Sequence, residues 1–207
     1  MMKIEKFVLG SLATNCYLIE NEESKELIVV DPAICPDYLI NHVKSKGFTP
    51  KAVFLTHGHF DHVMGLDRWV KEFDIPVYLH EEEKEILANP KLNLSWMFGK
   101  NYQFDQVVCL KDGDIVNLAG FTFQVIHTPG HTAGGCCYYE EAEEVLISGD
   151  TLFRFSVGRS DFPTGSTKEL QQSIRERLFV LPDEVMVYPG HNSNTCIGEE
   201  KMHNPFV

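Results

Sequence analysis

Residues 56–62 read THGHFDH, and they follow directly on the apolar run AVFL at residues 52–55. The run predicts a buried strand, and the heptapeptide then supplies four metal-ligating side chains within one turn. Imidazole and carboxylate are ligand types that zinc and similar divalent metals prefer, and a rigid strand end fixes their directions. The heptapeptide therefore predicts a metal site at this strand end, with these ligands: His57, His59, Asp61 and His62.

Three further residues of the same ligand types each follow a predicted strand and a glycine. They are His131 in TPGHTAGG, Asp150 in LISGDTLF and His191 in VYPGH. Loops at strand ends tend to meet at one edge of a rigid sheet scaffold, where functional residues gather. Glycine permits the sharp turns and close backbone approach that such a meeting requires. We expect these three side chains to join the four of the heptapeptide.

The composition indicates an acidic globular protein. The chain has 207 residues, of which 43% are hydrophobic and 23% charged, so it can bury a full core without covalent cross-links. Its formal net charge of -12 repels polyanions over long range, which argues against nucleic acid as the main partner. The oligomeric state is not predicted by any feature of the sequence.

The termini and the cysteines bear on location. No apolar run approaches the roughly 20 residues that a membrane helix needs, so we expect no membrane partner. The opening MMKIEKFVLGSLATN lacks a sustained apolar block followed by a cleavage site. The six cysteines include no C-x-x-C pair, which favours reduced thiols in a reducing compartment. A cytoplasmic location is therefore expected.

Strand and helix patterns alternate along the chain without a low-complexity linker or a break in composition. Strands with interspersed helices favour sheets covered by helices. Ser166 and Glu169 have capping-box spacing at the start of one of these helices. We expect a single domain over residues 1–207. The strands are predicted near residues 4–9, 16–19, 27–30, 52–55, 77–79, 107–110, 121–126, 137–139, 145–147 and 185–188, and helices near 36–47, 63–73, 81–87 and 166–178.

Several polar and aromatic residues are given ordinary roles. We expect Cys136 to be a buried thiol and His127 to support the loop of His131, without ligating metal. The acidic runs at residues 81–83 and 140–144 are expected to be solvated. The aromatic stretch is expected to belong to the core, because aromatic clusters mostly do. That stretch comprises Trp96, Met97, Phe98 and Tyr102.

The order H-x-H-x-D-H, followed by single His, Asp and His, resembles the signature of the metallo-β-lactamase superfamily over nearly the whole chain. The resemblance implies an α/β (α+β) fold, a four-layer αβ/βα sandwich in which helices flank two mixed sheets. It also implies two divalent metal ions, with zinc first and with iron and manganese accepted by the same ligands. The first ion would be held by His57, His59 and His131 and the second by Asp61, His62 and His191, with Asp150 bridging them.

Within that superfamily the chain is similar to the short glyoxalase II group, the hydroxyacylglutathione hydrolases. The similarity rests on GDTLF at 149–153, GRSDFPTGS at 158–166 and IGEEKMHNPF at 197–206. It implies hydrolysis of a small anionic thioester such as S-lactoylglutathione by a metal-bridging hydroxide, with Asp61 and Asp150 as catalytic residues. Arg159 is the candidate for binding the substrate, because its guanidinium is a planar, permanently charged fork.

The similarity also leaves alternatives open. Full-length glyoxalase II has a C-terminal helical domain with glutathione contacts, and only 16 residues follow His191 here, so glutathione specificity is not implied. Persulfide dioxygenases share the fold but hold a single iron, for which His57, His131 and Asp150 would be the ligands. Lactonases and β-lactamases share the ligand spacing, and a metal-binding regulatory module with weak turnover would need the same residues.

Overall fold

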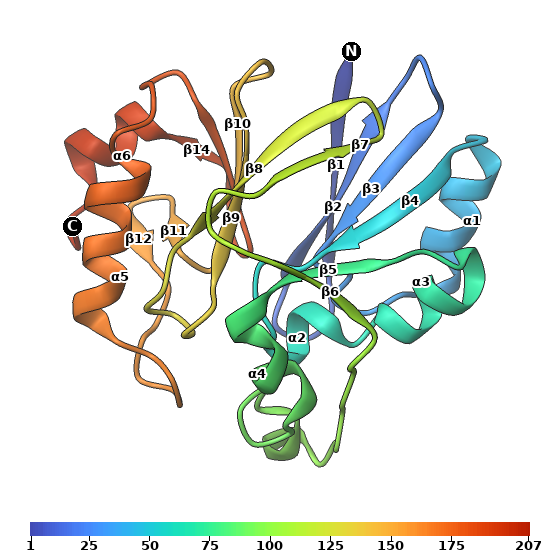
Figure 1. Cartoon of the computed structure of the whole chain (residues 1–207), viewed down its shortest axis with the longest axis horizontal. Coiled ribbons are helices and arrows are strands. Elements are labelled where there is room, and N and C mark those ends of the chain that lie inside the picture. The colour runs from blue at the N-terminus through green and yellow to red at the C-terminus, as the bar shows by residue number, and fades with distance from the viewer.

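Two six-stranded sheets, each of mixed strand direction, form the centre of the molecule (Figure 1). The computed structural model describes all 207 residues. The first sheet has the order β1-β2-β3-β4-β5-β6, in which β3 to β6 run parallel to one another. Its strands are β1 Met2–Leu9, β2 Thr14–Asn21, β3 Glu26–Val30, β4 Thr49–Phe54, β5 Val77–His80 and β6 Val107–Leu110.

The second sheet has the order β14-β13-β10-β9-β8-β7, and only β10 and β13 are parallel in it. The strands β7, β11, β12 and β14 were not predicted; the last three have two residues each, too few for a recognisable alternation. The strands are β7 Ile115–Leu118, β8 Phe121–His127, β9 Cys136–Glu140, β10 Val145–Gly149, β13 Met186–Pro189 and β14 Thr195–Cys196, with a small separate hairpin of β11 Leu152–Phe153 and β12 Ser156–Val157.

Helices cover the outer face of each sheet, so the predicted four-layer αβ/βα sandwich is confirmed (Figure 1). The Ser166 Oγ accepts a hydrogen bond from the Glu169 N–H at 3.3 Å and caps α5, as the spacing predicts. None of the helices is both long and apolar enough to cross a membrane. They are α1 Asp37–Ser45, α2 Phe60–Val63, α3 Leu66–Phe73, η1 Glu81–Glu83, α4 Lys84–Ala88, η2 Ser95–Phe98, α5 Thr167–Ser173, η3 Ile174–Leu178 and α6 Ile197–His203.

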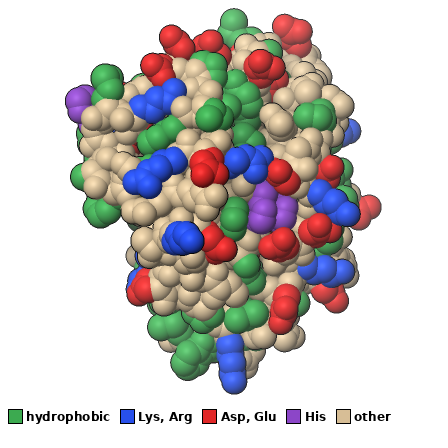
Figure 2. Space-filling model, turned by 60° about the vertical axis from the view of Figure 1, so that its left-hand side comes forward, with side chains coloured by type: hydrophobic (Ala, Val, Ile, Leu, Met, Phe, Trp, Pro, Cys, Tyr) green, Lys and Arg blue, Asp and Glu red, His purple; other side chains and the backbone are tan.

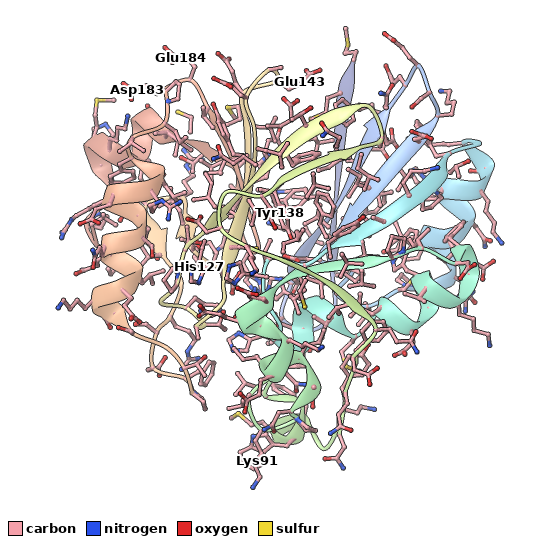
Figure 3. All side chains as sticks on the ribbon, viewed as in Figure 1. Lys91, His127, Tyr138, Glu143, Asp183 and Glu184 are labelled. Atoms are coloured by element: carbon pink, nitrogen blue, oxygen red, sulfur yellow. The ribbon has the colours of Figure 1, made fainter.

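The alternation of side chains along β3 shows how one strand supplies two cores. Leu27 and Val29 pack with α1 and α3 in one apolar cluster, whereas Ile28 and Val30 pack between the two sheets in another. Tyr138 from β9 is fully buried in this inner cluster (Figure 3). A third cluster joins the second sheet to α5 and α6. Apolar residues on both faces explain why the central strands read as continuous apolar runs.

Strand direction brings the predicted ligands to one edge of the two sheets. The parallel strands β3 and β4 end next to each other, and β4 leads directly into the heptapeptide. In the second sheet β10 and β13 are parallel, and the Gly190 N–H donates to the Gly149 carbonyl at 2.8 Å. Asp150 and His191 therefore leave the sheet side by side. We call this edge the ligand edge.

Candidate metal centre

The seven predicted side chains meet in one cluster at the ligand edge, which we call the seven-residue cluster. Asp150 lies at its centre, because Oδ1 is 3.5 Å from His62 Nε2 and Oδ2 is 3.5 Å from Nε2 of both His131 and His191. Acidic and basic side chains are interspersed over one face of the molecule, with apolar side chains between them (Figure 2). Donor atoms lie within 4.8 Å of one another in three overlapping groups: His57, His59 and His131; His57, His62 and Asp150; Asp61, His62 and His191.

The three histidines of the first group are buried beside one another. Burial, together with the neighbouring histidines, lowers the pKa of His57 and His59 well below the usual histidine value. Burial also lowers the pKa of His131. These rings are therefore neutral near pH 7, and the neutral imidazole is the form that binds a metal.

The third group has the opposite electrostatic character, because carboxylates surround its fully buried histidine. Burial lowers the pKa of His62, but the carboxylates of Asp61, Asp150 and Asp31 outweigh it and raise the pKa to about 10. Burial raises the pKa of Asp61, yet His62 and His191 hold it well below the usual carboxyl value. This half of the cluster therefore stabilises positive charge.

Buried polar atoms without a hydrogen bond indicate whether these residues fit metal ions. The Nε2 atoms of His57, His59 and His62 and the Oδ1 of Asp150 are buried without a hydrogen-bond partner. Each unsatisfied buried polar group costs about 1–3 kcal/mol, so four at one point are unusual in a folded protein. The cluster's ion pairs are all between its own histidines and carboxylates or with Asp31, and none involves Lys or Arg. Divalent ions would satisfy all four atoms.

Asp31 is a supporting residue that the sequence analysis missed. Its Oδ2 lies 2.9 Å from Nδ1 of His62 and accepts a hydrogen bond from the Thr56 hydroxyl at 2.7 Å. The same hydroxyl is 3.1 Å from Nδ1 of His57. One carboxylate thus orients a ring in each half of the cluster, leaving Nε2 free for a metal. The available signal was its position directly after the apolar strand Glu26–Val30.

Hydrogen bonds from outside the cluster hold two further members. The Thr14 hydroxyl donates to Asp61 Oδ2 at 2.9 Å, and Nδ1 of His131 is 2.6 Å from the backbone oxygen of Arg159. Because Nδ1 of His131 donates to that carbonyl, Nε2 of the neutral ring carries no proton, and it faces Nδ1 of His59 at 2.9 Å inside the cluster. The orientation of the cluster is therefore fixed before any ion binds.

Two of the glycines that precede ligands are required by geometry. Gly149 has a φ of +49°, in the left-handed region that favours glycine. A Cβ on Gly190 would lie 2.2 Å from Asp150 Oδ1 and 2.7 Å from Cε1 of His62. Any side chain at position 190 would displace two members of the cluster.

The expectation that the acidic runs are solvated is wrong for Glu83 and Glu140, which are 0% and 4% exposed. Glu83 Oε2 accepts from the Gly58 N–H at 2.7 Å, and Oε1 accepts from the Gly134 N–H at 2.9 Å. It ties the heptapeptide to the loop after His131. The short helix η1 turns the third glutamate inward, and burial raises its pKa to about 7.

The aromatic stretch is also placed differently from the expectation. Trp96, Met97 and Phe98 are 55%, 54% and 51% exposed, so their assignment to the core is wrong, whereas Tyr102 packs against the first core cluster. Met97 and Phe98 line a pocket of about 310 Å³ that opens over the seven-residue cluster. The pocket is lined by Leu12, His59, Phe60, Asp61, Leu94, Met97, Phe98, His131, Asp150, Arg159, Phe162 and His191.

Arg159 lines this pocket, as expected for a substrate-binding residue, but its guanidinium has other partners. Nε and Nη2 donate to the two carboxylate oxygens of Asp161 at 2.7 and 2.8 Å. The guanidinium carbon also lies 3.7 Å from the centre of the Phe162 ring. Its positive charge is thus neutralised by a neighbour two residues away, and substrate binding by Arg159 stays a prediction.

Residues that were given supporting or ordinary roles lie outside the cluster. His127, near the ligand edge (Figure 3), stacks on His80 with 4.1 Å between ring centres. Its Nε2 is 2.9 Å from the Ala133 carbonyl, in the loop that carries His131. Cys136 is a buried free thiol, and all six cysteines are unpaired. The predictions for His127 and Cys136 are confirmed.

Comparison with known proteins agrees with this geometry. The family model of the metallo-beta-lactamase superfamily matches residues 9–191. The hydroxyacylglutathione hydrolase GloC of Haemophilus influenzae is 33% identical over 214 residues, covering 100% of this chain and 98% of that protein. The crystal structure of the BLEG-1 B3 metallo-beta-lactamase matches with a TM-score of 0.94 and 39% identity over 99% of both chains. A second crystal structure, TTHA1623 in a di-iron-bound form, matches with a TM-score of 0.87 and 37% identity, covering 98% of this chain and 100% of that one.

The matches cover the strand ends and loops that carry all seven of the clustered side chains. More than half of the chain is matched by the family model, and the relatives are matched over nearly their full length. The fold, the order of the ligand types and their convergence agree with one another. The chain belongs to the metallo-beta-lactamase superfamily.

Proposed function

We propose that the protein is a dinuclear metal-dependent hydrolase that cleaves a thioester such as S-lactoylglutathione. The observation that carries the proposal is the pair of donor groups, His57 with His59 and His131 and Asp61 with His62 and His191, joined through Asp150 at the floor of a pocket. The name of the relative GloC, a hydroxyacylglutathione hydrolase, supports the thioester as substrate. Zinc is the proposed metal, and the ligand types also accept iron and manganese.

The two ions, when bound, supply a hydroxide nucleophile near pH 7 and a Lewis acid for the substrate carbonyl. Asp150 would help to hold both ions, because its two oxygens face different histidines of the cluster. Asp61 stays ionised and is held by the Thr14 hydroxyl, so it can accept a hydrogen bond from the attacking water. The thiol that departs has a pKa of about 8.5 and leaves without a dedicated acid.

A single-iron dioxygenase fits the same residues less well. Two histidines and one aspartate, His57, His131 and Asp150, would serve the iron. The Nε2 atoms of His59 and His62, which have no hydrogen-bond partner, would then stay without one. The two-ion arrangement accounts for all of these groups, which favours the hydrolase.

The test is metal analysis of the purified protein combined with a substrate panel of thioesters, lactones and persulfides. We expect two metal ions per chain and thioester hydrolysis at the same rate with and without oxygen, since hydrolysis consumes only water. Stoichiometric oxygen uptake with a persulfide, with the thioesters left intact, would establish the dioxygenase instead. Faster hydrolysis of a lactone than of every thioester would support the proposed metal centre but contradict the proposed substrate.

The variant His59→Ala separates catalysis from a purely regulatory role. The ring of His59 lines the pocket and is one of the unpaired donors, so its loss should lower metal content and turnover together. Full thioester turnover in this variant would remove the proposed role of the cluster. Trp96→Ala is the control for nonspecific damage, because Trp96 is in the same short helix as Met97 and Phe98 but outside the pocket lining.

A further inference from the structure

We infer that the pocket binds the acyl chain of its thioester substrate as an uncharged, apolar group. The surface that would receive the chain, which we call the apolar wall, consists of Leu12, Phe60, Leu94, Met97 and Phe98. The inference rests on the proposed thioester hydrolysis and adds the chemical class of the group that is transferred to water.

The apolar wall lies in the same pocket as the proposed metal ligands. Phe60 sits between His59 and Asp61 in the heptapeptide, and its ring is 4.3 Å from that of Phe98 between centres. Met97 and Phe98 expose 54% and 51% of their surface. Apolar surface in water is unfavourable, at roughly 25 cal/mol per Å², and a ligand chain would remove it from water. The wall and the cluster residues His59, Asp61 and Asp150 line the same pocket, so a thioester carbonyl held at the cluster would have its acyl chain in the space beside the wall.

Asn93, which is fully buried, connects the segment that carries Leu94, Met97 and Phe98 to the heptapeptide. The backbone oxygen of Asn93 accepts from the Phe60 N–H at 2.8 Å. Its side-chain amide donates to the carbonyls of Leu87 and Tyr102 at 3.1 and 2.9 Å. Leu94 then adopts a φ of +67°, an uncommon conformation for a residue with a side chain. A wall fixed in this way loses little conformational freedom when a chain binds, which favours binding.

The charges around the pocket disfavour a carboxylate on the acyl group. Arg159 is the only Lys or Arg in the lining, and Asp161 already occupies its Nε and Nη2 atoms. The adjoining pocket over Asp150 and His191 also contains Arg159 as its only cation. A distal carboxylate would thus lose its hydration against Met97 and Phe98 without gaining a free cation.

The kinetic test uses the metal-loaded protein and acetyl, butyryl and hexanoyl thioesters of one uncharged thiol. We expect kcat/KM to rise about two- to fourfold for each added methylene, the range expected for partial to full burial. Phe98→Ser and Met97→Ser should flatten this slope. The matched control is Trp96→Ser, which removes a similarly exposed side chain from the same helical turn but lies outside the pocket lining. Hydrolysis without a dependence on chain length would overturn the inference and leave the proposed function standing.

A binding measurement keeps the inference independent of turnover. The product acids acetate, butyrate and hexanoate are titrated calorimetrically into the metal-loaded protein. Affinity should rise with chain length in the wild type and in Trp96→Ser, and the rise should disappear in Phe98→Ser. If no thioester is hydrolysed but this pattern holds, the proposed function fails and the apolar subsite stands. Equal affinities for the three acids would overturn the subsite.

A succinyl thioester tests the charge argument, because it places a carboxylate where the butyryl chain has a methyl group. We expect hydrolysis about tenfold slower than for the butyryl thioester, since a carboxylate loses hydration at the wall. Asp161→Asn frees the guanidinium of Arg159 and should restore much of the succinyl rate while leaving the butyryl rate unchanged. Equal rates for succinyl and butyryl thioesters in the wild type would contradict the inferred apolar class.

Discussion

Two regions of the molecule place histidine and carboxylate donor atoms within 4.8 Å of one another, but they differ in their countercharges. One is the seven-residue cluster; the other, the strand–helix cluster, consists of Glu5, Glu20 and His42 on β1, β2 and α1. In the strand–helix cluster Lys3 lies 2.7 Å from Glu5 Oε1, and Lys46 contacts both glutamates. The seven-residue cluster has no such ammonium group.

Ligand types alone therefore do not distinguish a metal site from an ion-pair network. The distinguishing feature is buried nitrogen and oxygen atoms that have neither a hydrogen bond nor a neighbouring Lys or Arg. Buried carboxylates need a cation, and the strand–helix cluster obtains it from lysines of its own chain. One oxygen of the strand–helix cluster, Glu20 Oε2, is buried without a hydrogen bond, but the ammonium group of Lys3 lies 3.5 Å from it. The seven-residue cluster instead keeps three imidazole nitrogens and a carboxylate oxygen buried without a hydrogen bond and with no Lys or Arg beside them. We therefore expect metal ions to bind only in the seven-residue cluster.

The largest effect is expected from Asp150→Ala. Removal of the central carboxylate should reduce the metal content below two ions per chain and lower thioester turnover by about 100-fold or more. This loss exceeds the roughly 10- to 100-fold range that is typical when a residue hydrogen-bonded to a metal ligand is changed. Metal analysis and steady-state kinetics measure both effects. The matched change in the other region is Glu20→Gln, for which two ions per chain should persist. Loss of a bound ion in Glu20→Gln would break the comparison.

Metal removal should have the next largest effect, on stability. A ligand present at 100 times its Kd stabilises the folded state by about 2.7 kcal/mol, which for 207 residues corresponds to roughly 5–10 °C in Tm. Thermal unfolding with and without a chelator measures the loss. Glu5→Gln should show the same difference as the wild type. A chelator effect that persists in Asp150→Ala would place the stabilising ion elsewhere.

Asp31→Asn sharpens the comparison, because it changes a residue that contacts His62 without changing any of the seven clustered residues. We expect metal affinity or turnover to fall by about 10- to 100-fold, because His62 and Thr56 lose a shared acceptor while all seven side chains remain. Competition with a chelator of known affinity measures the change. Asp37→Asn, at a carboxylate that is 81% exposed, serves as the control. Unchanged affinity in Asp31→Asn would show that the Asp31 carboxylate does not orient His62 for metal binding.

The smallest effect is the pH dependence of the strand–helix cluster. Burial raises the pKa of Glu5, but Lys3, Lys46 and His42 outweigh it and lower the pKa from 4.5 to about 2. The folded state thus favours the ionised carboxylate, so this stabilisation is present above pH 4.5 and is lost as the pH falls toward 2. We expect under about 1 kcal/mol for these partly exposed pairs. Urea unfolding between pH 6 and 3 should show a shallower acid loss in Glu5→Gln, and an identical loss would exclude Glu5 as its source.

Much of the fold and of the cluster could be predicted from local patterns. The apolar runs predicted most of the strands of both sheets, and each member of the seven-residue cluster follows such a run within a few residues. Asp31 was missed although it also follows a strand, because it does not follow a glycine as His131, Asp150 and His191 do. Glu83, Met97 and Phe98 were misplaced because a single helical turn decides which side chains face inward.

The sequence by itself determined the ligand types, their order and their positions at strand ends, since these follow from local composition and periodicity. Only the tertiary structure decided which carboxylates meet lysines and which stay unpaired, and which aromatic residues face the pocket. The reason is that burial and Coulomb interactions depend on distances through space, and the atoms concerned, such as those of Glu5 and Lys46 or His57 and His131, are separated by long stretches of chain.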